Sequence, residues 1–243
     1  MLDPSLTEEQ LWAALPSLGD EELPEVLEHP SANEKHVLKL MERMDLAPEI
    51  LQRIAKGSWI QKMRIQAALV NHPRTPLGEA MHFLNFLMWR EICRVIVNFK
   101  LPPELRHRAE ALLMQRTRKL ATGEKVTLAR IAAGQVLKLL RLEKDARVVK
   151  GLLENPRLVE DDVLYLINQR SVPAPVLEAV ARDMKWSSRR EVRVALLRNP
   201  RTPLACALTF VTSLTEMECQ QLLRDPKVPM SVRKAISRKS QKR

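Results

Sequence analysis

Arginine side chains follow a proline in three similar phrases of this 243-residue chain, and they suggest anion binding. Arg74 ends "NHPR", Arg157 ends "ENPR" and Arg201 ends "RNPR". If the three phrases fold alike, these guanidinium groups line up along one edge at regular spacing, where they could follow a row of phosphates. They could equally bond the free carbonyl groups at the end of the preceding helix. The sequence leaves both interpretations open.

A second group of cations lies in the C-terminal half of the chain. In the segment from Ser188 to Arg198, Arg189 and Arg193 are one helical turn apart and opposite Val192 and Ala195. A solvated polar face is the ordinary reading of one such helix, but the density of cations nearby predicts an anionic partner. The other candidate binding residues are Arg147, Lys150, Arg182, Lys185, Arg190, Arg198, Arg233 and Lys234.

Two tryptophans recur at equivalent places, Trp59 and Trp186, each ahead of a similar apolar segment. An exposed pair could stack on bases or hold a cation. The sequence favours packing anchors instead, because large aromatic side chains usually serve the core.

No pattern of catalytic or metal-binding residues was found. The five histidines lack HExxH or other ligand spacing, and there is no GxSxG motif or glycine-rich phosphate loop. The cysteines Cys93, Cys206 and Cys219 are odd in number and far apart, which favours neither disulfides nor a thiolate metal site. We therefore expect no catalytic residue, metal or cofactor, and a reducing, cytoplasmic location.

Charge is distributed unevenly. The chain carries a formal net charge of +11, yet its first 34 residues hold nine acids and no base. A positive body attracts nucleic acid, anionic lipid or an acidic protein. A further hypothesis is that the acidic leader folds back on this body and competes with the ligand.

The elements that carry these residues are expected to be helices. Six glycines and one tyrosine beside 45% hydrophobic residues favour an all-α protein, with the sixteen prolines marking helix ends. No apolar run is long enough to cross a bilayer, and the first residues do not form a signal peptide.

The sequence is internally duplicated. Residues 47–109 align without a gap with residues 174–236, at a shift of 127 and with 17 of 63 positions identical. A partial third copy covers residues 146–157. The copies share a small residue, Ala68, Gly151 or Ala195, which we expect at a close contact between helices.

The repeated proline phrase predicts a turn between helices. Asn199 should end one helix before Pro200, and Thr202 should cap the next, with Pro203 at its first position. Pro30, Pro73, Pro156 and Pro200 are 43, 83 and 44 residues apart, so a degenerate unit without its proline is expected near residues 115–129.

"REVRVALLRNPRTPLACALTFV" (Arg190 to Val211) resembles the leucine-rich repeat variant and the wider class of HEAT-like helical repeats. The resemblance is looser over residues 64–84 and partial over residues 147–166. It implies an α-solenoid, a curved stack of short helices that serves as a binding surface and carries no chemistry. We expect an acidic leader over residues 1–34, a single solenoid over 35–236, and a basic tail over 237–243.

Three functions fit this sequence. The first is a non-enzymatic scaffold that binds the nucleic-acid backbone without sequence specificity. The second is an adaptor for an acidic or helical protein segment. The third follows from a faint likeness of Trp186 and "SSRREVRVAL" to HEAT-like DNA glycosylases, which would imply excision of alkylated bases.

Overall fold

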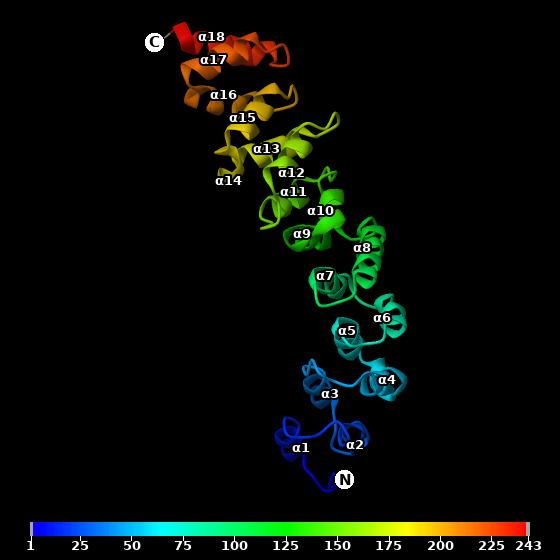
Figure 1. Ribbon diagram of the computed structural model, residues 1–243. Coiled ribbons are helices and arrows are strands. Elements are labelled where there is room, and N and C mark those ends of the chain that lie inside the picture. The colour runs from blue at the N-terminus through cyan, green and yellow to red at the C-terminus, as the bar shows by residue number, and fades with distance from the viewer. Residues whose placement is uncertain (1, 242–243) are drawn as a thin grey trace. The chain divides into compact units, whose positions relative to one another are not determined.

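The computed structural model describes residues 2–241, and these residues contain helices and turns but no strand, which confirms the all-α prediction (Figure 1). The chain divides into two compact units, unit 1 over residues 1–116 and unit 2 over residues 117–243. None of the helices within the described residues is both long enough and apolar enough to span a bilayer.

The helices of unit 1 form two rows (Figure 1). In one row α5 contacts both α3 and α7, and in the other α2 contacts α4. Their bounds are α1 (Glu8–Ala14), α2 (Leu23–Glu28), α3 (Glu34–Leu40), α4 (Pro48–Lys56), the 3₁₀ turn η1 (Ser58–Gln61), α5 (Met63–Asn71), α6 (Leu77–Leu84), α7 (Trp89–Val97) and α8 (Pro103–Thr117).

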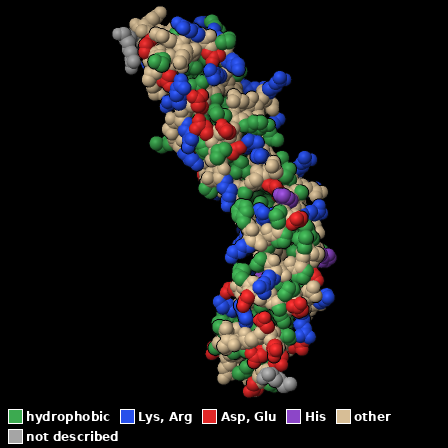
Figure 2. Space-filling model, in the orientation of Figure 1, with side chains coloured by type: hydrophobic (Ala, Val, Ile, Leu, Met, Phe, Trp, Pro, Cys, Tyr) green, Lys and Arg blue, Asp and Glu red, His purple; other side chains and the backbone are tan. Residues whose placement is uncertain are grey.

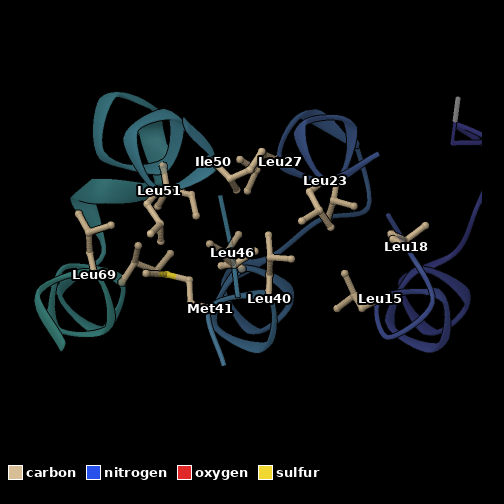
Figure 3. Close-up of a cluster of buried hydrophobic side chains, with 14 of the residues drawn as sticks. Leu15, Leu18, Leu23, Leu27, Leu40, Met41, Leu46, Ile50, Leu51 and Leu69 are labelled. Atoms are coloured by element: carbon tan, nitrogen blue, oxygen red, sulfur yellow. The ribbon is translucent and has the colours of Figure 1, made fainter. Parts of the chain in front are cut away.

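The core of unit 1 begins with the first helix. Leu11 of α1 and Leu23 of α2 are fully buried in one apolar cluster with Leu51 and Leu69, and Figure 3 shows this cluster. The expected acidic leader is therefore not a separate segment, because its apolar side chains are buried in the core of unit 1 while its carboxylates remain on the surface.

Unit 2 repeats the two-row arrangement. Helices α11, α13, α16 and α18 pack in sequence in one row, and α12 packs against α15 in the other. The bounds are α9 (Thr122–Ile131), α10 (Gly134–Leu140), α11 (Ala146–Leu153), α12 (Glu160–Ile167), α13 (Ala174–Arg182), α14 (Met184–Ser187), α15 (Arg190–Arg198), α16 (Leu204–Ser213), α17 (Glu216–Arg224) and α18 (Met230–Gln241).

Helix α18 runs on through most of the expected basic tail. The ammonium of Lys239 donates to the carbonyls of Val211, Thr212 and Leu214 at the end of α16, at 2.9, 2.9 and 2.6 Å. The tail is thus structured as far as Gln241. Its last two residues, Lys242 and Arg243, lie outside the described residues.

The internal duplication is visible in the helix bounds. Helices α5, α6, α7 and α8 begin 127 residues before α15, α16, α17 and α18. The correspondence continues upstream of the aligned sequence, where α1 and α3 begin 126 residues before α10 and α12. Helix α9 of unit 2 has no helical counterpart among the described residues of unit 1.

The proline phrases lie between helices, as predicted, but the threonine acts differently. Pro73, Pro156 and Pro200 all lie in turns. The Thr202 hydroxyl donates to the Leu196 carbonyl at 2.6 Å, and the Thr75 hydroxyl donates to that of Leu69 at 2.6 Å. The prediction that Thr202 caps the following helix is wrong, because its hydroxyl instead satisfies a carbonyl near the end of the preceding helix.

The degenerate unit expected near residues 115–129 is not found there. That stretch holds the end of α8, a short connection and most of α9. A turn of the same kind without the proline lies instead at Asn98, between α7 and α8.

Candidate anion-binding groove

Six turns that follow a helix begin with a polar residue, and we call these six residues the junction residues. In each of them, an acceptor atom of the side chain accepts a hydrogen bond from the backbone N–H of the residue two positions later. The distance is 2.8 Å from Arg157 N to Asn155, and 2.9 Å both from Arg201 N to Asn199 and from Lys227 N to Asp225. The junction residues are His29, His72, Asn98, Asn155, Asn199 and Asp225.

Most junction residues also donate to a carbonyl more than twenty residues earlier. Asn155 Nδ2 lies 2.7 Å from the Ala129 carbonyl, and Asn199 Nδ2 lies 2.6 Å from that of Ile167. His72 donates through Nε2 to the Arg43 carbonyl at 2.8 Å. Each side chain thus ties its turn to the preceding helices, which is a structural role.

Asp225 has no donor, and its surroundings differ accordingly. The Arg198 Nε donates to its carboxylate at 2.6 Å. The Lys227 N–H and then the Arg198 side chain hold the pKa of Asp225 below its ordinary value. Arg198 is thereby oriented beside the turn that carries Lys227.

The three arginines that follow the prolines are exposed, and each also lies near a carbonyl. Arg74 Nη1 donates to the Asp45 carbonyl at 2.6 Å. The contacts of Arg157 with Ile131 and of Arg201 with Val172 are longer, both 3.4 Å. Carbonyl bonding is therefore strong at Arg74 and weak at Arg157 and Arg201, the two residues of unit 2.

A groove of about 720 Å³ opens in unit 2 beside these turns. It is bounded by the end of α12, by α15 and by the turns after α15 and α17, and the small side chain of Ala195 lies in its wall. Its charged lining residues are Arg170, Arg198, Arg201, Lys227 and Glu191. Sequence reasoning missed Arg170 and Lys227. Lys227 could have been found, since "RDPK" has the register of "RNPR".

Unit 1 contains the corresponding groove, of about 620 Å³. Ala68 and His72 line it at positions equivalent to Ala195 and Asn199 of the other groove. Its charged lining is balanced, with Arg64 and Arg94 against Glu42 and Glu91. The lining of the unit 2 groove thus has four cations and one acid, and that of the unit 1 groove has two of each, although Arg74 and Lys100 occupy the positions of Arg201 and Lys227 in unit 1.

Of the three small residues that the sequence copies share, Gly151 shows the expected close contact between helices. A Cβ atom added to Gly151 would lie 2.7 Å from the Val126 carbonyl oxygen, because α9 packs on α11 there. Ala68 and Ala195 line the grooves instead. At these two alanines the close contact stays a prediction, because Ala195 is buried (6% exposed) although it lines the groove.

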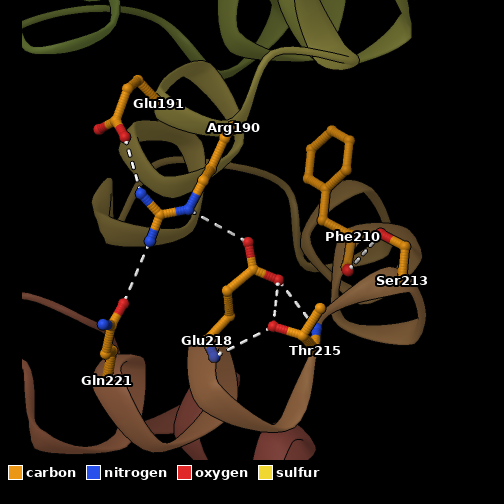
Figure 4. Close-up of polar contacts among 7 residues, drawn as sticks. All are labelled: Arg190, Glu191, Phe210, Ser213, Thr215, Glu218 and Gln221. Carbon is orange, nitrogen blue, oxygen red and sulfur yellow. Dashed lines mark hydrogen bonds and ion pairs between the residues drawn. The ribbon is translucent and has the colours of Figure 1, made fainter.

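The arginines of α15 are not a free solvated face. Arg189 pairs with Glu160 at 2.6 Å, and Arg190 contacts Glu218 at 3.3 Å and Glu191 at 3.0 Å, as Figure 4 shows for Arg190. These pairs join α15 to α12 and α17. Arg193, which is half-buried, has no ion pair within 4 Å inside residues 2–241.

Glu218 is fixed by its own helix. It accepts from the Thr215 N–H at 2.8 Å and completes a capping box at the start of α17. This hydrogen bond lowers the pKa of Glu218, with smaller contributions from the Thr215 hydroxyl and Arg190. Because the carboxylate is ionised and held in place, Arg190 is compensated within the protein.

Both tryptophans act as anchors. The Trp59 indole N–H donates to the Leu27 carbonyl at 2.9 Å, and that of Trp186 donates to the Leu153 carbonyl at 3.0 Å. Trp59 is half-buried, whereas Trp186 is 1% exposed, with Lys185 Nζ 4.5 Å and Arg189 Cζ 5.1 Å from its ring centre. Trp186 therefore has no free face for stacking and lines no base pocket.

The remaining predicted cations are scattered. Arg147 pairs with Asp145 at 2.7 Å and holds the pKa of that carboxyl at about 2, and Arg182 pairs with Glu178 at 2.5 Å. Arg233 donates to the Asp225 carbonyl at 2.9 Å. Lys150 and Lys234 are exposed on α11 and α18. Of the predicted residues, only Arg198 and Arg201 line the groove of unit 2.

The net positive charge of the chain comes from unit 2. Residues 117–243 hold 26 Lys and Arg against 13 Asp and Glu, whereas residues 1–116 hold 14 against 16. The net charges are therefore +13 and −2. Figure 2 shows acidic side chains gathered over the first helices of unit 1.

Within residues 2–241, no three His, Cys, Asp or Glu side chains gather closely enough to hold a metal ion. No protein family, curated protein or solved structure was found to match this chain.

Proposed function

We propose that this chain is a non-enzymatic scaffold, built as short α-solenoids of the HEAT-like kind, and that unit 2 binds the backbone of a nucleic acid in its cationic groove. The solenoid architecture is supported by the two rows of helices in each unit and by the recurrence of the helix bounds. The binding role is supported by the charge of unit 2.

The observation that carries this proposal is the contrast between the two grooves. They occupy equivalent positions on equivalent helices, so packing requirements are much the same in both. The groove of unit 2 has Arg170 and Arg198 where unit 1 has Met44 and Asn71, whereas Arg201 and Lys227 have cationic equivalents in Arg74 and Lys100. Cations placed together repel one another, and an anionic ligand is what would offset that cost.

Binding should be independent of sequence. Two of the three amide side chains that line the groove are already used, since Asn199 bonds Ile167 and Arg201 N, and Gln169 donates to the Arg141 carbonyl at 2.7 Å, while Asn168 is exposed. We expect the cations of the groove to contact phosphates, and such contacts carry no sequence information.

The test uses matched double variants in the two units. Arg201→Gln with Lys227→Gln removes two cations beside the groove of unit 2, and Arg74→Gln with Lys100→Gln removes their equivalents in unit 1. Binding of a fluorescent oligonucleotide is measured by anisotropy over a range of salt concentrations. We expect the unit 2 variant to bind more weakly. The plot of log affinity against log salt concentration should be shallower by about 1 to 2, because fewer phosphates are neutralised and fewer counterions are released on binding.

The unit 1 variant is expected to bind like the parent protein. Equal loss in both variants would mean that net charge alone matters, and the groove assignment would be abandoned. An acidic peptide bound more tightly than any oligonucleotide would favour the protein adaptor instead.

A further inference from the structure

Tyr165 is half exposed on α12, the helix whose last residues line the cationic groove. It belongs to α12, where its neighbour Leu164 and Asn168, one turn further on, both line the groove. The exposed fraction of Tyr165, the one tyrosine of the chain, is 49%. The ring is therefore accessible to a molecule bound along the groove.

Arg141 holds this ring from one side. The guanidinium carbon of Arg141 is 4.4 Å from the ring centre of Tyr165, and its Nη1 donates to Asp162 at 2.7 Å. The Arg141 and Asp162 side chains are only 16% and 12% exposed, and Gln169, which lines the groove, bonds the Arg141 backbone. The ion pair thus fixes a cation on one face of an aromatic ring that is half exposed, and we take the opposite face to be the one a ligand can reach.

We propose that the face of Tyr165 opposite Arg141 stacks on a base of a single-stranded nucleic acid whose phosphates lie in the groove. This inference rests on the proposed function and deepens it by naming the class of nucleic acid. In a duplex the bases are stacked on one another, so their faces are not available to a side chain. A single strand offers both a backbone for the cations and unstacked bases for the ring.

The arrangement explains why an aromatic ring beside the groove adds affinity without adding sequence preference. Every base has a flat aromatic face, so stacking tolerates all four. Arg141 pre-organises the ring, because the side chain is already held in one orientation before the ligand arrives.

The full-length protein is tested against three probes of equal length, a single-stranded oligonucleotide, its abasic counterpart and a duplex. Tyr165→Ala should weaken binding of the single strand by about 5- to 150-fold, the range for loss of one base stack. Binding of the abasic strand and the duplex should not change, and Tyr165→Phe should behave like the parent. Tyr165→Leu keeps an apolar side chain on α12 without a ring, and it should show the same loss as the alanine variant.

Phe99 supplies the control. It is 82% exposed in unit 1, with Arg106 Cζ 5.0 Å from its ring centre, so an arginine also lies over this ring. Phe99→Ala should leave single-strand binding unchanged. If the parent binds nucleic acid but Tyr165→Ala and Tyr165→Leu bind the single strand equally well, the stacking inference fails and the proposed function stands. If the parent binds none of the three probes, both fail.

Discussion

At the scale of single residues, the position of a junction residue calls for a side chain with both a hydrogen-bond acceptor and a hydrogen-bond donor. Asparagine and neutral histidine satisfy both requirements, and they occupy five of the six positions. Asp225 is the exception, because its carboxylate cannot donate to a carbonyl and instead accepts a hydrogen bond from Arg198 Nε. Residue type at this position therefore follows from what the preceding helices present to it.

Asn155 allows this rule to be tested, since it is fully buried and donates to both Ala129 and Ala132. Asn155→Asp should lower the free energy of unfolding by about 1–3 kcal/mol or more, because a carboxylate would face two carbonyl oxygens. Urea denaturation measures the effect. The same change at exposed Asn168 should cost less than about 0.5 kcal/mol. Equal effects at the two sites would contradict the rule.

Much of this turn could be predicted from the sequence. The phrases around Pro73, Pro156 and Pro200 correctly predicted where helices end. The partners of the arginines could not be predicted, because Arg189 pairs with Glu160 and Arg190 with Glu218, each nearly thirty residues away on another helix. Helical spacing indicates the face on which a side chain lies, but not what a neighbouring helix brings to it.

At the scale of helices, the same small residue serves two different purposes. At Gly151 it admits the backbone of α9, which passes too close for a side chain. At Ala195 it leaves the groove open. The aligned sequences predicted a small residue on one helical face in both cases, and they could not reveal that α9 packs on that face in one copy while a groove lies beside it in the other.

The two positions should respond differently to enlargement. Gly151→Ala should destabilise the protein by about 1–3 kcal/mol, because the new methyl group would lie against the Val126 carbonyl and α9 would have to shift. Ala195→Leu should weaken oligonucleotide binding, because the larger side chain would take up space in the groove that Ala195 lines. Thermal unfolding and anisotropy on both variants decide the matter. Strong destabilisation by Ala195→Leu would place that residue in a helix contact instead.

At the scale of the whole molecule, duplication supplied two equivalent units, and their charges then diverged. Unit 1 carries −2 and unit 2 carries +13, although their helices begin at corresponding positions. The sequence alone showed an acidic beginning and a basic remainder. It did not show that residues 2–34 are part of the core of unit 1, because that depends on where Leu11 and Leu23 pack.

This divergence predicts which turns a ligand will protect. The backbone amides of Arg201 and Lys227 each donate to a junction residue beside the cationic groove, and those of Arg74 and Lys100 do the same in unit 1. These turns lie at the surface, so their amides exchange with solvent through local opening. A bound single strand should slow hydrogen exchange at residues 198–201 and 225–227 and leave residues 71–74 and 98–100 unchanged, as mass spectrometry would show. Because the paired turns have the same hydrogen bonds, we expect similar protection in the free protein, and each turn is compared with itself before and after the oligonucleotide is added. Protection in both units would mean that the ligand does not distinguish the grooves, and charge would then not be what selects the site.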